Sequence, residues 1–167
     1  PLFRQKAEGI IRYVLEVASD KELGGFYASQ DADINMHDDG DYFTWTLAEL
    51  EEALPPDEAS VLALRYNVEP TGEMHHNPAK NVLWVDLHIE DIAERLGKDH
   101  HEVQRLLTRG NERLLAVRSG RTTPFVDKSI YTNWNAMMIS AFIDAYKVCG
   151  IEESRDQGLK SLDRLIQ

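Results

Sequence analysis

The sequence is poor in cysteine, and the shortage excludes two kinds of chemistry. Its single thiol, Cys149, can form no internal disulfide and no Cys-x-x-Cys redox pair. Cys149 lies in an apolar, helix-like stretch, where a free cysteine usually behaves as a small buried hydrophobe. We therefore expect this residue to pack in the interior rather than to react.

Long apolar runs are also missing. No window approaches the roughly 20 consecutive apolar residues that span a bilayer, and residues 1–6 lack the apolar stretch of a signal peptide. We expect an intracellular, cytoplasmic protein with no membrane role. Because the chain starts at Pro1 and its helical pattern runs to Gln167, we also expect a segment of a longer polypeptide.

Basic residues are scarce as well. Eighteen Lys and Arg stand against 29 Asp and Glu, giving a net charge of −11 that repels nucleic-acid phosphates. Residues 91–107 have the spacing of a helix-turn-helix around Gly97, but residues 98–102, where its second helix would begin, contain two acids and only one lysine. We expect a plain helical hairpin here and no nucleic-acid partner.

What the sequence does contain is helical periodicity. With 167 residues, 43% of them hydrophobic, the chain is long enough for one globular domain over residues 1–167. Thr46 followed by Glu49 forms a capping box that opens a helix. The pattern predicts a mainly α fold, with helices at residues 2–19, two short helices ending at Leu54 and Tyr66, and further helices at 89–96, 100–117, 132–148 and 152–165.

A small β component interrupts the helices. Residues 26–29 and 42–46 are short aromatic stretches separated by a turn-rich run, which predicts a long-looped β-hairpin. A polar connecting loop at residues 68–81 is followed by a brief, apolar, strand-like stretch at residues 82–85.

The candidate metal ligands have unsuitable spacings. Adjacent histidines cannot present the i, i+4 pair that aims two imidazoles at one metal from a helix. An acidic cluster around Gly40 has the composition of a calcium loop but lacks the alternation and closing glutamate of an EF-hand. We expect no metal and no cofactor; the residues considered are His75, His76, His100, His101, Asp38, Asp39 and Asp41.

Two acids follow a glycine turn next to aromatic residues. Asp31 and Asp33 come shortly after Phe26 and Tyr27. Aromatic faces stack on the C–H side of a pyranose, while carboxylates accept hydroxyl hydrogens or move protons, so this combination suits a sugar. The alternative is that Asp31 and Asp33 only cap the turn.

A second polar cluster precedes the helix that begins near residue 132. Asp127 and Lys128 lie a short loop before Trp134 and Asn135. Backbone N–H groups at a helix N-terminus favour anions and polar ligands, which predicts a site. A buried Trp134 with a capping Asn135 accounts for the same pattern.

These motifs occur in an order typical of one family. The sequence contains Gly-Gly-Phe-x-x-Ser-x-Asp-Ala-Asp at residues 24–33 and Tyr-Phe-Thr-Trp-Thr at 42–46. Pro-Phe-Val-Asp at 124–127 and Thr-Asn-Trp-Asn-Ala-Met-Met at 132–138 follow. Over nearly its whole length the chain resembles the YyaL-like, spermatogenesis-associated thioredoxin-domain family.

The resemblance implies a fold and a site. It implies an N-terminal thioredoxin-like domain, absent from this chain, and a helical (α/α)6 toroid similar to N-acylglucosamine 2-epimerases and six-hairpin, glycosidase-like proteins. About seven of the twelve helices are present, so we expect an open arc of helical hairpins. Six residues are implied at the mouth of the toroid: Asp31, Asp33, Trp45, Asp127, Trp134 and Asn135.

The leading functional hypothesis is a carbohydrate-binding domain that, in the full-length protein, epimerises or hydrolyses a sugar. Asp31 or Asp33 would act as general acid/base, and Trp45 and Trp134 would stack on the ring. Asn135 would orient a hydroxyl. The alternative is a non-catalytic scaffold for the thioredoxin-like domain.

An open arc also leaves apolar helix faces uncovered at its two ends. Exposed apolar patches of more than a few hundred Å² are rare on soluble monomers. We therefore expect self-association through the terminal helices as a twofold dimer. The residues concerned are Leu2, Phe3, Ile10 and Val14 at one end, and Leu159, Leu162, Leu165 and Ile166 at the other.

Overall fold

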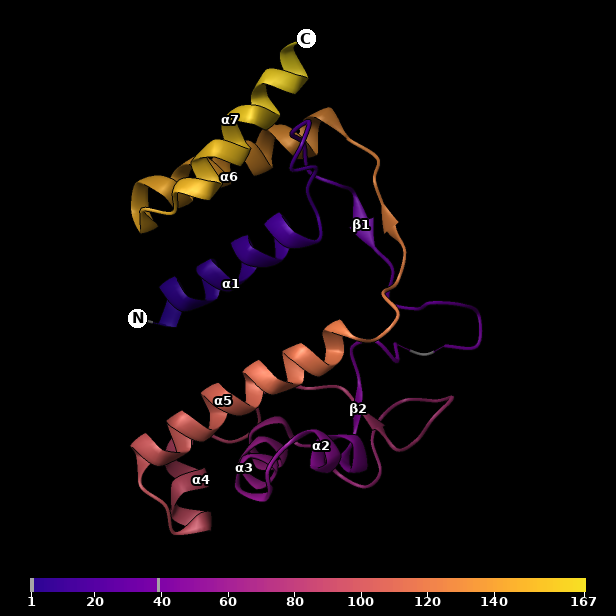
Figure 1. The fold of residues 1–167 in the computed structure, drawn as a ribbon, viewed down its shortest axis with the longest axis vertical. Helices are drawn as coiled ribbons and strands as arrows, with labels where there is room; N and C mark the ends of the chain where they lie inside the picture. The colour runs from indigo at the N-terminus through magenta and orange to yellow at the C-terminus, as the bar shows by residue number, and fades with distance from the viewer. Residues whose placement is uncertain (1, 39) are drawn as a thin grey trace. The chain divides into compact units, whose positions relative to one another are not determined.

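The computed structural model of the protein describes residues 2–38 and 40–167. Within these ranges the chain forms seven α-helices and four two-residue strands, which confirms the mainly α fold (Figure 1). It divides into two compact units. The terminal unit combines residues 1–31 with 125–167, and the central unit is the continuous segment 32–124.

The terminal unit is built from three helices. α6 (Thr132–Cys149) and α7 (Glu152–Ile166) form a helical hairpin, and α1 (Leu2–Glu16) packs on both. Gly150 ends α6 with φ 73°, a left-handed conformation that glycine adopts without steric cost. The small core comprises Ile11, Val14, Phe26, Ile139 and Phe142, and Phe26 meets Phe142 edge to face with ring centroids 4.7 Å apart.

The central unit has four helices and a larger core. These are α2 (Leu47–Ala53), α3 (Pro56–Tyr66), α4 (Ile89–Leu96) and α5 (His100–Ser119). α3 and α5 approach closely at Gly110, because glycine has no side chain. A Cβ at this position would lie only 2.6 Å from Cδ1 of Leu62. The buried apolar side chains are Trp45, Leu50, Leu54, Ala59, Val61, Leu62, Val68, Ile92, Ala93, Val103, Leu106, Leu107 and Leu114.

Local signals set the helix limits much as the sequence predicts. Thr46 and Glu49 form the reciprocal capping box at the start of α2. Asp99 caps α5 by accepting the Glu102 N–H, and Gly97 ends α4 with φ 63°. α4 and α5 form the expected helical hairpin. No helix in the described part of the chain combines the length and apolarity needed to cross a membrane.

The small β content is confirmed, but the predicted pairing between residues 26–29 and 42–46 is wrong. β1 (Ser29–Gln30) pairs antiparallel with β4 (Val126–Asp127). β2 (Trp45–Thr46) pairs antiparallel with β3 (Lys80–Asn81). The two halves of the expected hairpin belong to different units and take partners from distant segments. The wider expectation of a single domain that forms an arc of a toroid stays a prediction.

Candidate functional site

A glycine turn is anchored on α7 in the terminal unit. Gly24 and Gly25 have φ of 80° and 103°, in the left-handed region that favours glycine. A Cβ on Gly24 would lie 2.6 Å from the Lys160 carbonyl oxygen, so the turn lies directly against the α7 backbone. Ser161 Oγ accepts the Gly25 N–H at 2.8 Å, and Arg164 donates to the Gly24 carbonyl.

Asn135 joins the residue after this turn to α6. Its Oδ1 accepts the Phe26 N–H at 2.6 Å, and its Nδ2 donates to the Phe26 and Tyr131 carbonyls at 3.0 and 3.1 Å. The side chain is only 1% exposed. The Asn135 amide therefore satisfies buried backbone groups and has a structural role, while its predicted role in orienting a substrate hydroxyl stays a prediction.

The pairing of β1 with β4 brings the backbone segments that carry two of the predicted acids, Asp31 and Asp127, next to each other. Ala28 N–H donates to the Asp127 carbonyl at 3.0 Å, and Asp31 N–H donates to the Phe125 carbonyl at 2.8 Å. The Asp127 carboxylate accepts the Ser129 hydroxyl at 2.7 Å and its N–H at 2.9 Å. These hydrogen bonds lower the pKa of Asp127 below its ordinary value, so at neutral pH it is an ionised acceptor.

An apolar groove lies beside the turn and the start of α6. It has a volume of about 390 Å³, and its lining residues are Phe26, Tyr27, Ala28, Trp134, Asn135, Met137, Met138 and Ala141. Trp134 is 51% exposed and packs near Tyr131, with ring centroids 4.9 Å apart. Lys128 Nζ lies 5.7 Å from the Tyr27 ring centroid, which places a cation at the rim.

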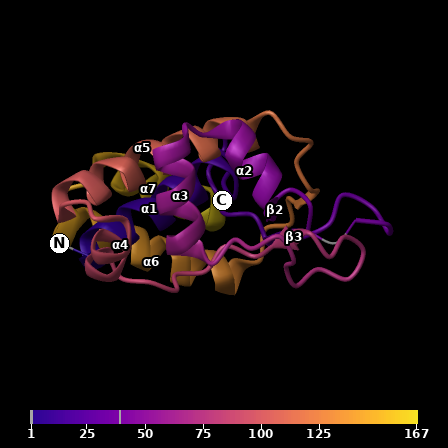
Figure 2. The same ribbon diagram turned by 90° about the horizontal axis from the view of Figure 1, so that it is seen from below.

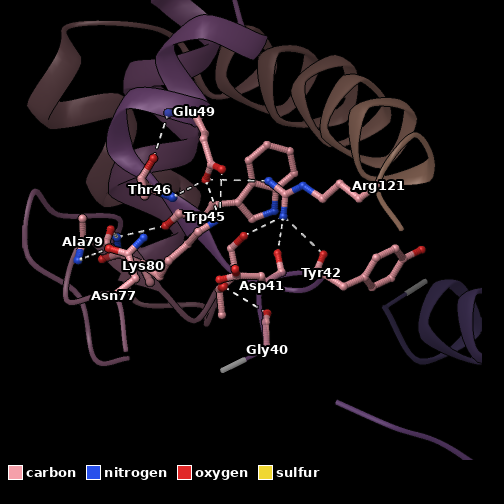
Figure 3. A network of polar contacts seen from close by, with 12 residues as sticks. Gly40, Asp41, Tyr42, Trp45, Thr46, Glu49, Asn77, Ala79, Lys80 and Arg121 are labelled. Carbon is pink, nitrogen blue, oxygen red and sulfur yellow. Dashed lines mark hydrogen bonds and ion pairs between the residues drawn. The ribbon is translucent and has the colours of Figure 1, made fainter. Parts of the chain in front are cut away.

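Trp45, in the central unit, lies inside a polar network (Figure 3). Its side chain is 2% exposed, and the Arg121 guanidinium carbon lies 4.0 Å from its ring centroid. Arg121 Nη1 donates to the carbonyls of Asp41 and Thr44, each at 2.8 Å. The ring is therefore covered by Arg121, and its contacts fix the loop that precedes β2.

Glu49 links this network to β3. Its carboxylate accepts the Thr46 N–H at 2.8 Å and pairs with Lys80 Nζ at 2.9 Å and Arg121 Nη2 at 3.7 Å (Figure 3). Burial alone raises the pKa of Glu49, but the Thr46 N–H and the cations of Lys80 and Arg121 outweigh it, so the net pKa is lowered. Sequence reasoning missed Arg121 and Lys80, which belong to no recognisable motif.

The predicted site residues fall in both units. The terminal unit contains Asp31, Asp127, Trp134 and Asn135, whereas Asp33 and Trp45 lie in the central unit. The carboxylates of Asp31 and Asp33 belong to exposed residues. Trp134 and Asn135 line the groove, and Asp127 precedes Lys128 at its rim.

The acidic loop near Gly40 has an internal structural explanation. Asp38 accepts the N–H groups of Ile34 at 2.6 Å and Asp41 at 2.8 Å, so its carboxylate organises the loop backbone. Asp39, the third acid of the calcium-like cluster, lies outside the described residues. Among the residues that are described, no group of three His, Cys, Asp or Glu side chains could hold a metal ion.

Comparison with known proteins relates the chain to one class of relatives. No family model matches the sequence. Spermatogenesis-associated protein 20 from Rattus norvegicus is 31% identical over 189 residues, covering 97% of the chain, and the Homo sapiens protein is 30% identical over 86% of it. The Mus musculus protein is 29% identical over 88% of the chain. The chain spans between 21% and 23% of the length of these relatives. It is therefore homologous to one segment of spermatogenesis-associated protein 20.

Proposed function

We propose that the chain is part of the helical domain of a protein of the spermatogenesis-associated protein 20 family, and that its terminal-unit groove binds a carbohydrate. The family's motifs and the homology over most of the chain support the first part. The second part rests on one observation: Trp134 is half-exposed in an apolar groove, and the Lys128 ammonium lies 5.7 Å from the ring of Tyr27, another lining residue.

The groove has the chemical elements of a sugar site. Sugar rings present apolar C–H faces that pack on aromatic side chains, and Trp134 and Tyr27 supply such surfaces. A few convergent polar groups then fix the orientation of a ligand in a mainly apolar pocket. The ionised Asp127 carboxylate accepts hydroxyl hydrogens, and the Lys128 ammonium donates to ring or hydroxyl oxygens.

The proposal concerns binding rather than a reaction. With its lowered pKa, Asp127 is a poor proton donor at neutral pH and is better suited to accepting hydrogen bonds. General acid/base catalysis by Asp31 or Asp33 stays a prediction, as does epimerase-like or glycosidase-like activity in the full-length protein. We assign no stacking role to Trp45, because Arg121 covers its ring.

Thermal unfolding with a panel of monosaccharides and disaccharides tests the proposal. A ligand that binds only the native state raises the melting temperature, and a concentration of about 100 times Kd adds roughly 2.7 kcal/mol. Trp134→Ala should abolish the shift. Trp84→Ala is a matched control because Trp84 is similarly exposed, at 46%, but lies in the central unit. No shift with any sugar, or an equal shift in both variants, would remove the carbohydrate proposal.

A second candidate function, as an interaction scaffold, is favoured by apolar side chains on α1 and α7. Phe3 and Ile10 on α1 and Ile166 on α7 are exposed, whereas Val14 and Leu165 pack into the terminal-unit core. A twofold dimer through these helices would cover the exposed residues. Sedimentation should then show concentration-dependent association that Phe3→Glu weakens, and a strict monomer at high concentration would contradict it.

A further inference from the structure

The strand-like stretch after β3 remains without a role in the proposed groove. Residues 82–86, here called the edge segment, run without a turn or bend from β3 toward α4 (Figure 2). Leu83 packs against the central-unit core. Val82, Trp84 and Val85 are about half-exposed, which is unusual for three large apolar residues within four consecutive positions.

The backbone of the edge segment has few internal partners. β3 pairs with β2 only at Lys80 and Asn81. At the two ends of the segment, Val82 N–H donates to Glu73 at 3.1 Å and Asp86 N–H donates to the Arg65 carbonyl at 3.0 Å. Within the described ranges, no hydrogen bond involves the N–H or C=O groups of residues 83–85. An extended, apolar, unpaired edge of this kind is a template for an added strand.

The charges around the edge segment favour a basic partner. The Glu73 carboxylate lies at its start and the exposed Asp86 at its end. In the described part of the chain neither forms an ion pair with a Lys or Arg side chain. The central unit as a whole has 18 acidic and nine basic residues. A second copy would bring like charges together, whereas a cationic strand would be attracted.

We propose that the edge segment docks an extended, basic segment of a partner polypeptide, which adds to it as a β-strand. Main-chain hydrogen bonds from residues 83–85 would supply much of the affinity, because these groups have no competing partner among the described residues. Trp84 and its exposed neighbours would contact alternate apolar side chains of the partner. Lys or Arg residues flanking that apolar stretch would face Glu73 and Asp86.

Fluorescence anisotropy with synthetic peptides tests this proposal on the intact chain. The probe is a labelled peptide with an alternating Val-Thr-Val-Thr centre and two Lys residues at each end. We expect saturable binding that weakens as salt is raised, and binding at least about tenfold weaker for the same peptide with Glu ends. Methylating alternate backbone nitrogens of the probe should also abolish binding, because it removes the donors of one edge.

Variants locate the docking position. Trp84→Pro removes one edge N–H that has no partner within the described ranges and should abolish binding, whereas Trp84→Ala keeps the N–H and should only weaken it. Trp134→Ala, in the other unit, should bind normally. Absence of peptide binding, equal binding of the Lys-ended and Glu-ended probes, or full binding of the methylated probe would overturn the proposal. Sedimentation showing a dimer that Trp84→Pro dissociates would identify a second copy as the occupant and overturn it equally.

Discussion

The two units achieve order in different ways. The central unit is one continuous segment with thirteen buried apolar residues in its core, whereas the terminal unit joins two distant segments around five. The terminal unit compensates with polar anchors between those segments, such as Asn135 on Phe26 and Ser161 on Gly25. The charges differ too, because the terminal unit has eleven acidic and nine basic residues while the central unit has twice as many acidic as basic ones.

The two units should therefore be destabilised most by different kinds of substitution. Burial of apolar area is non-directional and tolerates small rearrangements, so a large core distributes its stabilisation over many contacts. A buried hydrogen bond depends on two particular groups, and losing one partner leaves the other unsatisfied. We therefore expect the largest losses of unfolding free energy to come from apolar core substitutions in the central unit and from substitutions of single buried polar side chains in the terminal unit.

The largest expected effect is on the central-unit core. Leu62→Ala should cost about 2–5 kcal/mol of unfolding free energy, because Leu62 is fully buried against Gly110 and truncation leaves a cavity. Hydrogen exchange read helix by helix should accelerate in α3 and α5 while α6 and α7 keep their protection. Equally faster hydrogen exchange in both units would contradict this prediction, since it would show that the two units unfold together.

The next effect is on the polar anchor of the terminal unit. Asn135→Ala should cost about 2–3 kcal/mol, because it leaves the buried N–H and carbonyl of Phe26 without their partner. Asn133→Ala is the matched control on the same helix, where the side chain is exposed and the loss should be within about 0.5 kcal/mol. Chemical denaturation measures both. Similar losses for the two variants would contradict the anchoring role of Asn135.

A smaller effect concerns acid sensitivity of the central unit. Because the folded-state pKa of Glu49 lies below its ordinary value of 4.5, its stabilisation is fully present above that pH and is lost as pH falls through the lowered folded-state pKa. Glu49→Gln should lower stability at pH 7 and flatten its decline in that acidic window. A pH profile of the melting temperature measures both effects. If the melting temperature of the variant fell with acidity as steeply as that of the wild type, the contacts of Glu49 with Lys80 and Arg121 would not contribute to the pH dependence of stability.

Helices were the most predictable part of the structure. Their limits are set by neighbours in sequence: the Thr46 and Glu49 capping box, the glycines at 97 and 150, and the apolar periodicity of each amphipathic face. Such local signals are visible before any tertiary contact is known. α4 and α5 were also correctly predicted as two consecutive helices, because Gly97 ends the first and Asp99 caps the second.

Strand partners and buried polar roles were not predictable in the same way. Residues 29 and 30 pair with residues 126 and 127, and nothing local in either segment specifies so distant a partner. Asn135 was assigned a ligand-orienting role because the sequence does not show that its side-chain amide forms hydrogen bonds with the backbone N–H and carbonyl of Phe26. Arg121 lay in an unremarkable polar stretch, although three backbone carbonyls and the Trp45 ring converge on it.

The most direct test of the carbohydrate groove uses the three tryptophan indole N–H signals in a nitrogen-15 correlation spectrum. Trp45 is buried in the central unit, Trp84 is exposed in the same unit, and Trp134 is exposed at the groove. Titration with a sugar that raises the melting temperature should move one indole signal, identified as Trp134 by its loss in Trp134→Phe. A titration that moves the Trp84 signal instead, or leaves all three in place, would contradict a carbohydrate site in the groove.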